Sequence, residues 1–194
     1  QRHSEHTVLV TSTNFAALGL AEPLLHALTA CKFTMPTPIQ AQALPPLLAG
    51  RDVLGVAQTG SGKTAAFCLP LLQHLSAENV RAASFMTRAL ILAPTRELAL
   101  QIDETVRRLS ANLRLRSVVI IGGASRHRQV EMMRRGADIV IGTPGRVCDL
   151  MTTRELNLSA VRGFILDEAD RMLDLGFIKD IKRVVANLPA TRHS

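Results

Sequence analysis

The stretch VLGVAQTGSGKT, residues 53–64, joins a short apolar run to a loop of small residues, and the helix-like AAFCLPLLQHL follows directly. Gly60 and Gly62 allow backbone amides to turn inward around phosphate oxygens, and Lys63 can reach β- and γ-phosphates. Thr64 can offer its hydroxyl to Mg²⁺, and the N-terminal end of the following helix favours negative charge. The stretch therefore predicts a triphosphate-binding loop between a strand and a helix.

Ala57 stands where the strict form of such a loop, GxxxxGK[ST], has its first glycine. The apolar run before the loop and the helix after it supply the structural context that a chance match lacks. We therefore expect nucleotide contacts from the loop residues Gln58, Thr59, Gly60, Ser61, Gly62, Lys63 and Thr64.

Apolar patterns extend this α/β interpretation along the chain. Five aliphatic runs lack polar alternation, as strands covered on both faces require: residues 53–57, 89–93, 117–121, 138–141 and 164–166. Helical spacing gives two apolar stripes, Leu98, Ile102, Val106 and Leu109, then Phe177, Ile181, Val184 and Leu188. Two more helices, residues 21–28 and 38–48, precede the first strand, the second with Pro38 at its first position. The prediction is one α/β domain with a doubly wound, mostly parallel sheet and helices on both faces.

The run FILDEADRML, residues 164–173, changes abruptly from apolar to acidic. Because ligands sit beyond the carboxyl ends of parallel strands, these acids should lie on the same edge of the sheet as the phosphate loop. Asp167 then fits the group that holds Mg²⁺, and Glu168 is placed to orient or deprotonate an attacking water. Helix capping is the alternative for these acids, and it stays open for Asp170 in particular. The sequence predicts a catalytic group of Lys63, Asp167 and Glu168.

Composition limits the partners and the compartment. Lys plus Arg outnumber Asp plus Glu by 23 to 16, and the formal net charge of +7 favours polyanions such as nucleic acid, although it also serves solubility. The cysteines Cys31, Cys68 and Cys148 have no CxxC spacing, and their odd number suits reduced, buried thiols. No apolar run approaches the ~20 residues of a membrane-spanning helix. We expect a cytoplasmic protein with no membrane partner.

The letters DEAD at residues 167–170 and the phosphate loop stand in an order that resembles the DEAD-box ATP-dependent RNA helicases, over roughly residues 15–189. The resemblance implies the N-terminal RecA-like domain of such an enzyme, a P-loop nucleoside triphosphatase with ATP and Mg²⁺ as cofactors. It makes residues 15–194 the ATP-binding domain. Residues 1–14 show no periodicity, and we expect a flexible tail or a cloning remnant there. By analogy alone, the source is bacterial.

The segment FTMPTPIQ, residues 33–40, resembles the adenine-reading Q motif of this family. The resemblance implies that Gln40 hydrogen-bonds the adenine edge and that Phe33 stacks on the base, while Phe15 matches an upstream aromatic residue of the motif. A Gln amide can pair with N6 and N7 of adenine together, a pattern that guanine and the pyrimidines lack. Without the resemblance, both phenylalanines would be interpreted as core residues.

Three further loops follow expected strands and resemble the RNA-contacting motifs of the family: PTRELA, GG and TPGR. The resemblance implies RNA contacts from Pro94, Thr95, Arg96, Gly122, Gly123, Thr143, Pro144, Gly145 and Arg146. Small residues and helix starts expose backbone amides, which suits a sugar-phosphate backbone. Aromatic residues make up only 3% of the chain, so we expect backbone contacts with weak sequence preference. For each motif taken alone there is a simpler interpretation: the glycines only turn the chain, and Arg96 is a surface ion-pair partner.

The expected function is ATP-dependent unwinding of RNA duplexes or remodelling of RNA–protein complexes by a monomer. The resemblance implies a second RecA-like domain, to which Asp170 would couple the site through a Ser-Ala-Thr motif that these residues lack. The isolated chain is therefore expected to bind nucleotide and to hydrolyse it slowly. Two alternatives stay open: a P-loop ATPase that acts on DNA, and a non-catalytic RNA-binding module.

Overall fold

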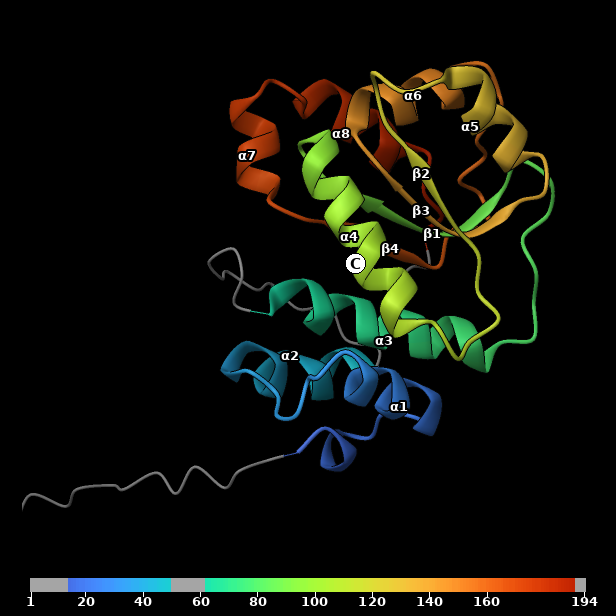
Figure 1. Ribbon diagram of the computed structural model, residues 1–194. Helices are drawn as coiled ribbons and strands as arrows, with labels where there is room; N and C mark the ends of the chain where they lie inside the picture. Colours follow the sequence, from blue (N-terminus) through green and yellow to red (C-terminus); the bar gives the residue numbers. More distant parts are fainter. Residues whose placement is uncertain (1–13, 50–61, 191–194) are drawn as a thin grey trace, which may run out of the picture.

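A four-stranded parallel sheet lies between two groups of helices in the computed structural model, which describes residues 14–49 and 62–190 (Figure 1). Its strands are β1 (Thr87–Leu92), β2 (Ser117–Ile120), β3 (Ala137–Gly142) and β4 (Gly163–Leu166). Their order across the sheet is β2-β3-β1-β4, and all three pairings are parallel. Parallel neighbours need crossover connections, and a helix supplies each of them.

The helices alternate with the strands along the chain. Before the sheet come η1 (Ala16–Leu18), α1 (Glu22–Ala30), α2 (Pro38–Leu48) and α3 (Lys63–Ala77). The crossover helices are α4 (Arg96–Leu109), α5 (Arg126–Met133) and α6 (Pro144–Thr152). After β4 come α7 (Ala169–Asp174) and α8 (Ile178–Ala186). None of the helices in the described part of the chain is long and apolar enough to cross a membrane.

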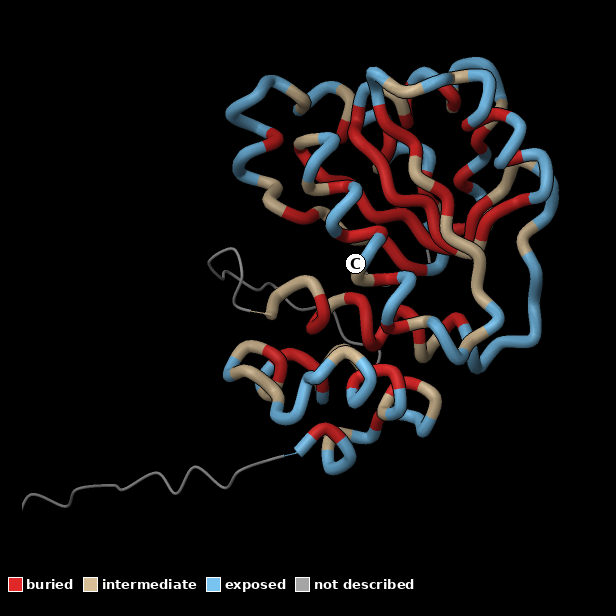
Figure 2. Tube along the Cα trace, viewed as in Figure 1, coloured by how far each residue is buried: buried red, intermediate tan, exposed pale blue. Residues whose placement is uncertain are grey.

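Successive residues of β1 face opposite sides of the sheet and enter two separate cores. Ala89 and Ile91 pack with residues of α1 to α4, whereas Leu90 and Leu92 pack with residues of α5, α6, α7 and α8. Figure 2 shows the buried strands between helices whose outer surfaces are exposed. Helices therefore cover both faces of the sheet, and the predicted fold class is confirmed.

Four of the five expected strands are present, and the fifth, residues 53–57, lies outside the described residues. β1 begins two residues before its apolar run because its first side chains, Thr87 and Arg88, are buried with polar partners. The guanidinium of Arg88 donates to Asp138 Oδ1 at 3.1 Å and to Leu75 O at 2.9 Å. Apolar periodicity misses such residues because their burial depends on partners far away in the sequence.

The bounds predicted for α2 are those observed, and Pro38 is its first residue. Thr37 caps the helix by accepting a hydrogen bond from Gln40 N, while Gln40 Oε1 accepts one from Thr37 N at 2.9 Å. This capping box satisfies two backbone donors at the helix start. The two apolar stripes also form as expected, with Ile102, Val106 and Leu109 buried on α4 and Ile181 and Val184 buried on α8.

Candidate functional site

The segments that follow the four strands lie together along one edge of the sheet. Three backbone hydrogen bonds tie neighbouring strand ends to each other: Ala93 N to Gly142 O at 2.9 Å, Thr143 N to Ile120 O at 3.1 Å, and Asp167 N to Leu92 O at 2.9 Å. The segments PTRELA, GG, TPGR and DEAD begin at or within two residues of these bonds. The sheet therefore gathers motifs that are widely separated in the sequence.

Lys63 and Asp167 form an ion pair at this edge. Lys63 is the first residue of α3, Asp167 follows β4, and the Lys63 Nζ to Asp167 Oδ1 distance is 2.7 Å. Their side chains are only 14% and 6% exposed. Apart from this ion pair, the buried Oδ1 atom has no hydrogen-bond partner among the residues that the structure describes. The predicted proximity of the two residues is present, with unused acceptor capacity on the carboxylate.

A small pocket lies beside this ion pair, lined by Thr64, Phe67, Cys68, Ile91, Ile102, Ile165 and Asp167. Burial and, to a smaller extent, the negative charge of Asp167 together raise the pKa of the Cys68 thiol to about 12. The thiol therefore stays neutral, and Asp167 carries the negative charge of the pocket.

The described residues of the phosphate loop fit a nucleotide and a metal ion by their chemistry. Lys63 and the N-terminal end of α3 favour phosphate. The Thr64 hydroxyl and the Asp167 carboxylate are oxygen donors of the kind that Mg²⁺ prefers, and Asp167 Oδ1 has capacity to spare. The remaining predicted contacts, Gln58, Thr59, Gly60 and Ser61, lie outside the described residues.

Glu168 adopts a left-handed backbone conformation, with φ 54° and ψ 52°, immediately before α7. Such a conformation costs a non-glycine residue roughly 1–2 kcal/mol, and strain of this kind clusters at functional sites. The Glu168 carboxylate lies 3.6 Å from an Arg171 Nη1 atom. Asp170 is exposed in the first turn of α7, and the cap position belongs to Glu168. The capping alternative for Asp170 is therefore wrong.

Gln40 connects the start of α2 to the start of α3. Its side chain is fully buried, with Nε2 donating to Gly62 O at 3.2 Å and Oε1 accepting from Thr37 N at 2.9 Å. Gly62 has φ 83°, and a Cβ atom there would lie 2.6 Å from Gln40 Nε2. The oxygen and the nitrogen of the Gln40 side-chain amide thus each make one hydrogen bond within the protein, which leaves one N–H and one lone pair for the expected adenine contact.

The two phenylalanines assigned to the adenine site differ in exposure. Phe33 is 38% exposed and can present its ring to a ligand. Phe15 is 5% exposed and packs in the core that contains Leu24 and Leu44. The core alternative therefore holds for Phe15, and its nucleotide role stays a prediction without support from its position.

Arg96 links two of the segments that resemble RNA-contacting motifs. It is exposed at the start of α4, and its Nη1 atom donates to Gly123 O at 3.3 Å. Thr95 caps the same helix by accepting a hydrogen bond from Leu98 N at 3.2 Å, and Pro94 is buried before it. Arg96 thus contacts the turn at Gly122 and Gly123. The interpretation of Arg96 as a surface ion-pair partner did not predict this contact.

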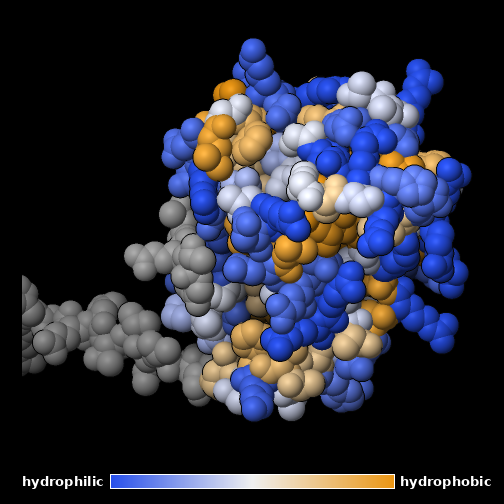
Figure 3. Space-filling model, turned by 45° about the horizontal axis from the view of Figure 1, so that its top comes forward, coloured by the Kyte–Doolittle hydropathy of each residue, from blue (hydrophilic) through white to orange (hydrophobic). Residues whose placement is uncertain are grey.

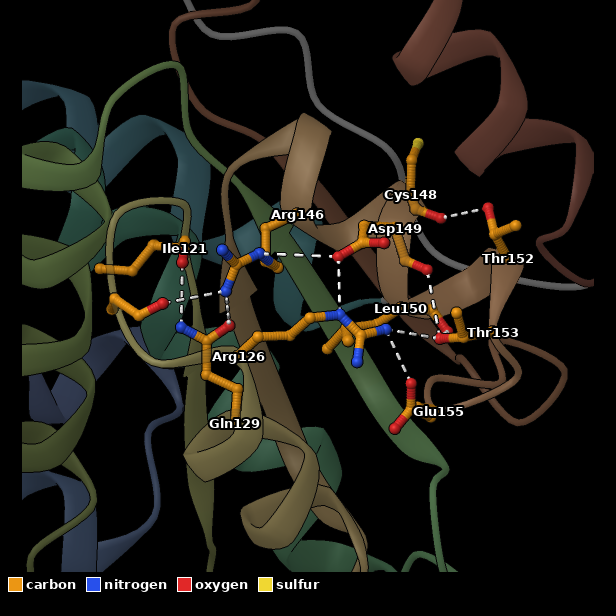
Figure 4. Close-up of polar contacts among 11 residues, drawn as sticks. Ile121, Arg126, Gln129, Arg146, Cys148, Asp149, Leu150, Thr152, Thr153 and Glu155 are labelled. Atoms are coloured by element: carbon orange, nitrogen blue, oxygen red, sulfur yellow. Dashed lines mark hydrogen bonds and ion pairs between the residues drawn. The ribbon is translucent and has the colours of Figure 1, made fainter.

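Arg146 makes a second such link, from α6 to the same turn (Figure 4). Its Nη1 atom donates to Ala124 O at 3.2 Å and to Gln129 Oε1 at 3.1 Å, and Gln129 Nε2 donates to Ile121 O at 2.9 Å. Its side chain is only 16% exposed. Thr143, Pro144 and Gly145 form the start of α6 beside it. Sequence reasoning placed Arg146 at an RNA-facing loop but missed its internal hydrogen bonds.

Arg126 was missed altogether. It is the first residue of α5, and its guanidinium contacts Asp149 Oδ2 at 2.9 Å, Thr153 Oγ1 at 2.9 Å and Glu155 Oε1 at 2.7 Å (Figure 4). Hydrogen bonds to Asp149 and Glu155 raise the pKa of Arg126, and those from Thr153 and Arg126 lower the pKa of Glu155. No motif marks Arg126, because its partners lie 23 to 29 positions further along the chain.

A parallel α/β sheet with a lysine at a helix start and a buried aspartate at a strand end defines the class of P-loop nucleoside triphosphatases. The particular family follows from the comparison with known proteins. The DEAD/DEAH box helicase family matches residues 37–194, and the chain belongs to this family.

Individual relatives agree with this membership. The chain is 49% identical to the ATP-dependent RNA helicase DeaD of Klebsiella pneumoniae over 178 residues, which cover 91% of this chain and 27% of that protein. It is 46% identical to the RNA helicase CrhR of Synechocystis, over 97% of this chain and 37% of that protein. It is 42% identical to the DEAD-box ATP-dependent RNA helicase 52A of rice, over 93% and 32%. The chain thus spans about a quarter to somewhat over a third of these relatives' length.

Proposed function

We propose that the chain is the ATP-binding RecA-like part of an ATP-dependent RNA helicase. The observation that carries the proposal is the single sheet edge on which the Lys63–Asp167 ion pair and the segments around Arg96, Gly123 and Arg146 meet. A nucleotide and an RNA backbone bound at one edge can influence each other through short paths of contacts. Relatives whose names include ATP-dependent RNA helicase support the proposal.

The nucleotide contacts of the proposal have separate roles. Lys63 and the N-terminal end of α3 bind phosphate oxygens, while Thr64 and Asp167 hold Mg²⁺, which neutralises phosphate charge during hydrolysis. Glu168 orients the attacking water from its position after Asp167. Gln40 and Phe33 bind the adenine, Gln40 through the amide N–H and lone pair that its bonds to Gly62 and Thr37 leave unused.

The RNA contacts of the proposal are to the sugar-phosphate backbone. The turn at Gly122 and Gly123 and the amide of Gly145 at the start of α6 offer backbone N–H groups that bind phosphate without reading base sequence. Figure 3 shows mostly hydrophilic residues on the face over α5 and α6, with hydrophobic residues in separate groups. Such a surface suits a charged partner. A second RecA-like domain, coupled through Asp170, would complete the cleft.

Nucleotide selectivity tests the adenine site. Calorimetry in the presence of Mg²⁺ should show ATP or ADP binding with little binding of GTP or CTP, and Gln40→Ala should reduce that preference. Because the Gln40 amide also caps α2, thermal unfolding of the variant must be measured in parallel. Equal affinity for ATP and GTP in the unaltered chain would contradict the assignment.

RNA and DNA competition separates the proposal from its alternatives. A single-stranded RNA oligonucleotide should bind better than DNA of the same sequence, because the 2′-hydroxyl distinguishes the two. Preference for DNA would favour a DNA-directed P-loop ATPase. RNA binding that is unaffected by ATP, together with no ATP binding, would favour a non-catalytic RNA-binding module.

A further inference from the structure

The turn between β2 and α5, residues 121–125, is held by side chains from three different helices. Gln129 Nε2 of α5 donates to Ile121 O at 2.9 Å. Arg96 Nη1 of α4 donates to Gly123 O at 3.3 Å, and Arg146 Nη1 of α6 donates to Ala124 O at 3.2 Å. Three carbonyl oxygens of one short turn therefore face side-chain donors of the protein itself.

The orientation of these carbonyls fixes the direction of the neighbouring amides. A peptide unit is planar and trans, and the described residues contain no cis peptide bond, so each N–H points away from the preceding C=O. The N–H groups of Gly122, Ala124 and Ser125 therefore point away from the three side-chain donors. Gly123, between them, has φ 75°. Backbone amides of a turn that contains a left-handed residue can form a concave site for an anion.

Arg126 holds this turn from its other end. Its contacts to Asp149, Thr153 and Glu155 attach the start of α5 to the end of α6 and the segment after it, while Arg146 attaches α6 to Ala124 (Figure 4). Arg126 thus reaches from α5 to α6, and Arg146 reaches from α6 to the turn before α5. Asp149 Oδ2 lies 2.9 Å from Arg126 Nε and 3.8 Å from Arg146 Nε, so one carboxylate serves both.

The charge around Arg126 argues against a direct contact with phosphate. Two carboxylates, Asp149 and Glu155, lie within 3 Å of its guanidinium nitrogens, and their hydrogen bonds already occupy it. A phosphate bound to Arg126 would therefore lie close to these two carboxylates, and their negative charges would repel it. The guanidinium of Arg126 therefore suits a connection within the protein. Arg126 would affect a bound anion only by fixing the position of the turn at residues 121–125.

We propose that Arg126 is a positioning residue for RNA: it fixes the turn at residues 121–125 so that outward-pointing amides receive a backbone phosphate. This inference rests on the proposed function and adds a residue outside the segments PTRELA, GG, TPGR and DEAD. The anion is a phosphodiester of single-stranded RNA.

Binding of a labelled single-stranded oligoribonucleotide, followed by fluorescence anisotropy with Mg²⁺ and a non-hydrolysable ATP analogue, tests the proposal. Arg126→Gln should raise the Kd for RNA about tenfold, the loss expected when one charge-assisted hydrogen bond is misplaced. The matched control is Arg134→Gln, at the other end of α5, which also removes an ion pair, with Glu131 at 2.8 Å. The control should change the Kd less than twofold.

Glu155→Gln separates positioning from simple electrostatics. This change removes a negative charge near the RNA edge, so a purely electrostatic effect would tighten RNA binding. Loss of positioning instead weakens it, and Arg126→Gln combined with Glu155→Gln should bind no more weakly than Arg126→Gln alone. Arg126→Lys keeps the charge but not the three-acceptor geometry, and should still weaken binding several-fold.

The salt dependence of binding gives a further readout. Loss of a direct phosphate contact lowers the slope of log K against log salt by about 0.7, whereas misplaced neutral amides leave the slope unchanged. In a ¹⁵N-labelled chain, the amide signals of Gly122, Ala124 and Ser125 should shift on RNA addition, and less so in Arg126→Gln. The affinity for the ATP analogue and the melting temperature should stay close to those of Arg134→Gln.

The outcomes distinguish the two levels of inference. An unaltered chain that binds the ATP analogue but no RNA would overturn the proposed function and this inference together. RNA binding that is equal in Arg126→Gln, Glu155→Gln and the Arg134→Gln control would overturn the positioning role alone. A lower salt slope, with Arg126→Lys equal to the unaltered chain, would show a direct contact instead. If Arg126→Gln does not fold, Arg126→Lys and Glu155→Gln decide the question.

Discussion

Lys63 Nζ lies 2.7 Å from Asp167 Oδ1, so an ammonium group occupies the immediate surroundings of a buried carboxylate at the end of β4. The two residues come from separate parts of the chain, one at the start of α3 and one after the strand. A carboxylate that is 6% exposed needs positive charge beside it. In the proposed function, Mg²⁺ and Lys63 share that role once a nucleotide binds.

Replacing this carboxylate tests the assignment. Asp167→Asn should weaken Mg²⁺-dependent ATP binding at least about tenfold, because the amide cannot supply the negative charge that the metal ion and Lys63 require. Calorimetry with and without Mg²⁺ measures the effect. The control is Asp170→Asn, which alters an exposed carboxylate three positions further on. Equal ATP binding by Asp167→Asn and the control would remove Asp167 from the metal site.

The contact between Gly62 and Gln40 predicts a stability effect. In Gly62→Ala, the new Cβ atom would lie 2.6 Å from Gln40 Nε2 and 2.8 Å from Thr37 Oγ1, at φ 83°. Left-handed strain and overpacking together should lower the free energy of unfolding by about 1–3 kcal/mol. Urea denaturation followed by circular dichroism measures the change.

The matched control for that variant is Gly145→Ala. Gly145 lies in the first turn of α6 and has no positive φ, and a Cβ atom added there would lie more than 4 Å from other segments in residues 14–49 and 62–190. Alanine should be neutral there or stabilise the helix by up to about 1 kcal/mol. Similar losses of stability in both variants would show that the packing around Gly62 is not the cause.

The cysteines should differ in reactivity. At pH 8, a thiol with a pKa of about 12 has roughly one thiolate in ten thousand, so Cys68 should resist iodoacetamide in the folded protein, as should the buried Cys148. Cys31 is partly exposed and should react first. Mass spectrometry after timed alkylation identifies the modified residues. Alkylation of Cys68 at the rate of Cys31 would contradict its burial.

The same raised pKa predicts weaker stability at high pH. In the unfolded chain the Cys68 thiol ionises near its ordinary value of about 8.5, while the folded state keeps the proton until about pH 12. The contribution of Cys68 to stability is therefore fully present below pH 8.5 and is lost as the pH rises toward 12. Cys68→Ala should make the stability loss over this interval less steep in urea denaturation.

Local patterns were sufficient to predict much of the fold. The apolar stripe on α4, the buried runs of β1 to β4 and the bounds of α2 follow from spacing and from proline at a helix start, which act over a few residues. The shared edge follows from the parallel sheet. Cys31, predicted to be buried, is only partly so, because it lies at the end of α1.

Polar connections between distant segments could not be predicted from those patterns. Arg88 is buried because Asp138 and Leu75 supply acceptors, and Gln40 turns inward because Gly62 supplies one. Arg126 depends in the same way on Asp149. Arg and Gln are residue types that usually lie at the surface. Only folding brings the partners of these side chains close to them.

The left-handed backbone at Glu168 predicts an unusual order of stability among its variants. Asn tolerates this conformation better than Ala. The free energy of unfolding of Glu168→Asn should therefore be about 0.5–1 kcal/mol higher than that of Glu168→Ala. At Asp170, inside α7, helix propensity favours Ala, so Asp170→Ala should be more stable than Asp170→Asn by about 0.5 kcal/mol. Both Glu168 variants lose the contact with Arg171, so that contact cancels in the comparison.

Urea denaturation of the four variants measures both orders under the same conditions. An order at position 168 opposite to that at position 170 would show that the folded chain keeps residue 168 in a strained, left-handed backbone. The same order at both positions would mean that the left-handed conformation is not held in solution. Hydrolysis assays test the role of the carboxylate itself: Glu168→Gln, which keeps the size of the side chain, should lose the slow ATP turnover expected of the unaltered chain while its ATP affinity stays within about twofold.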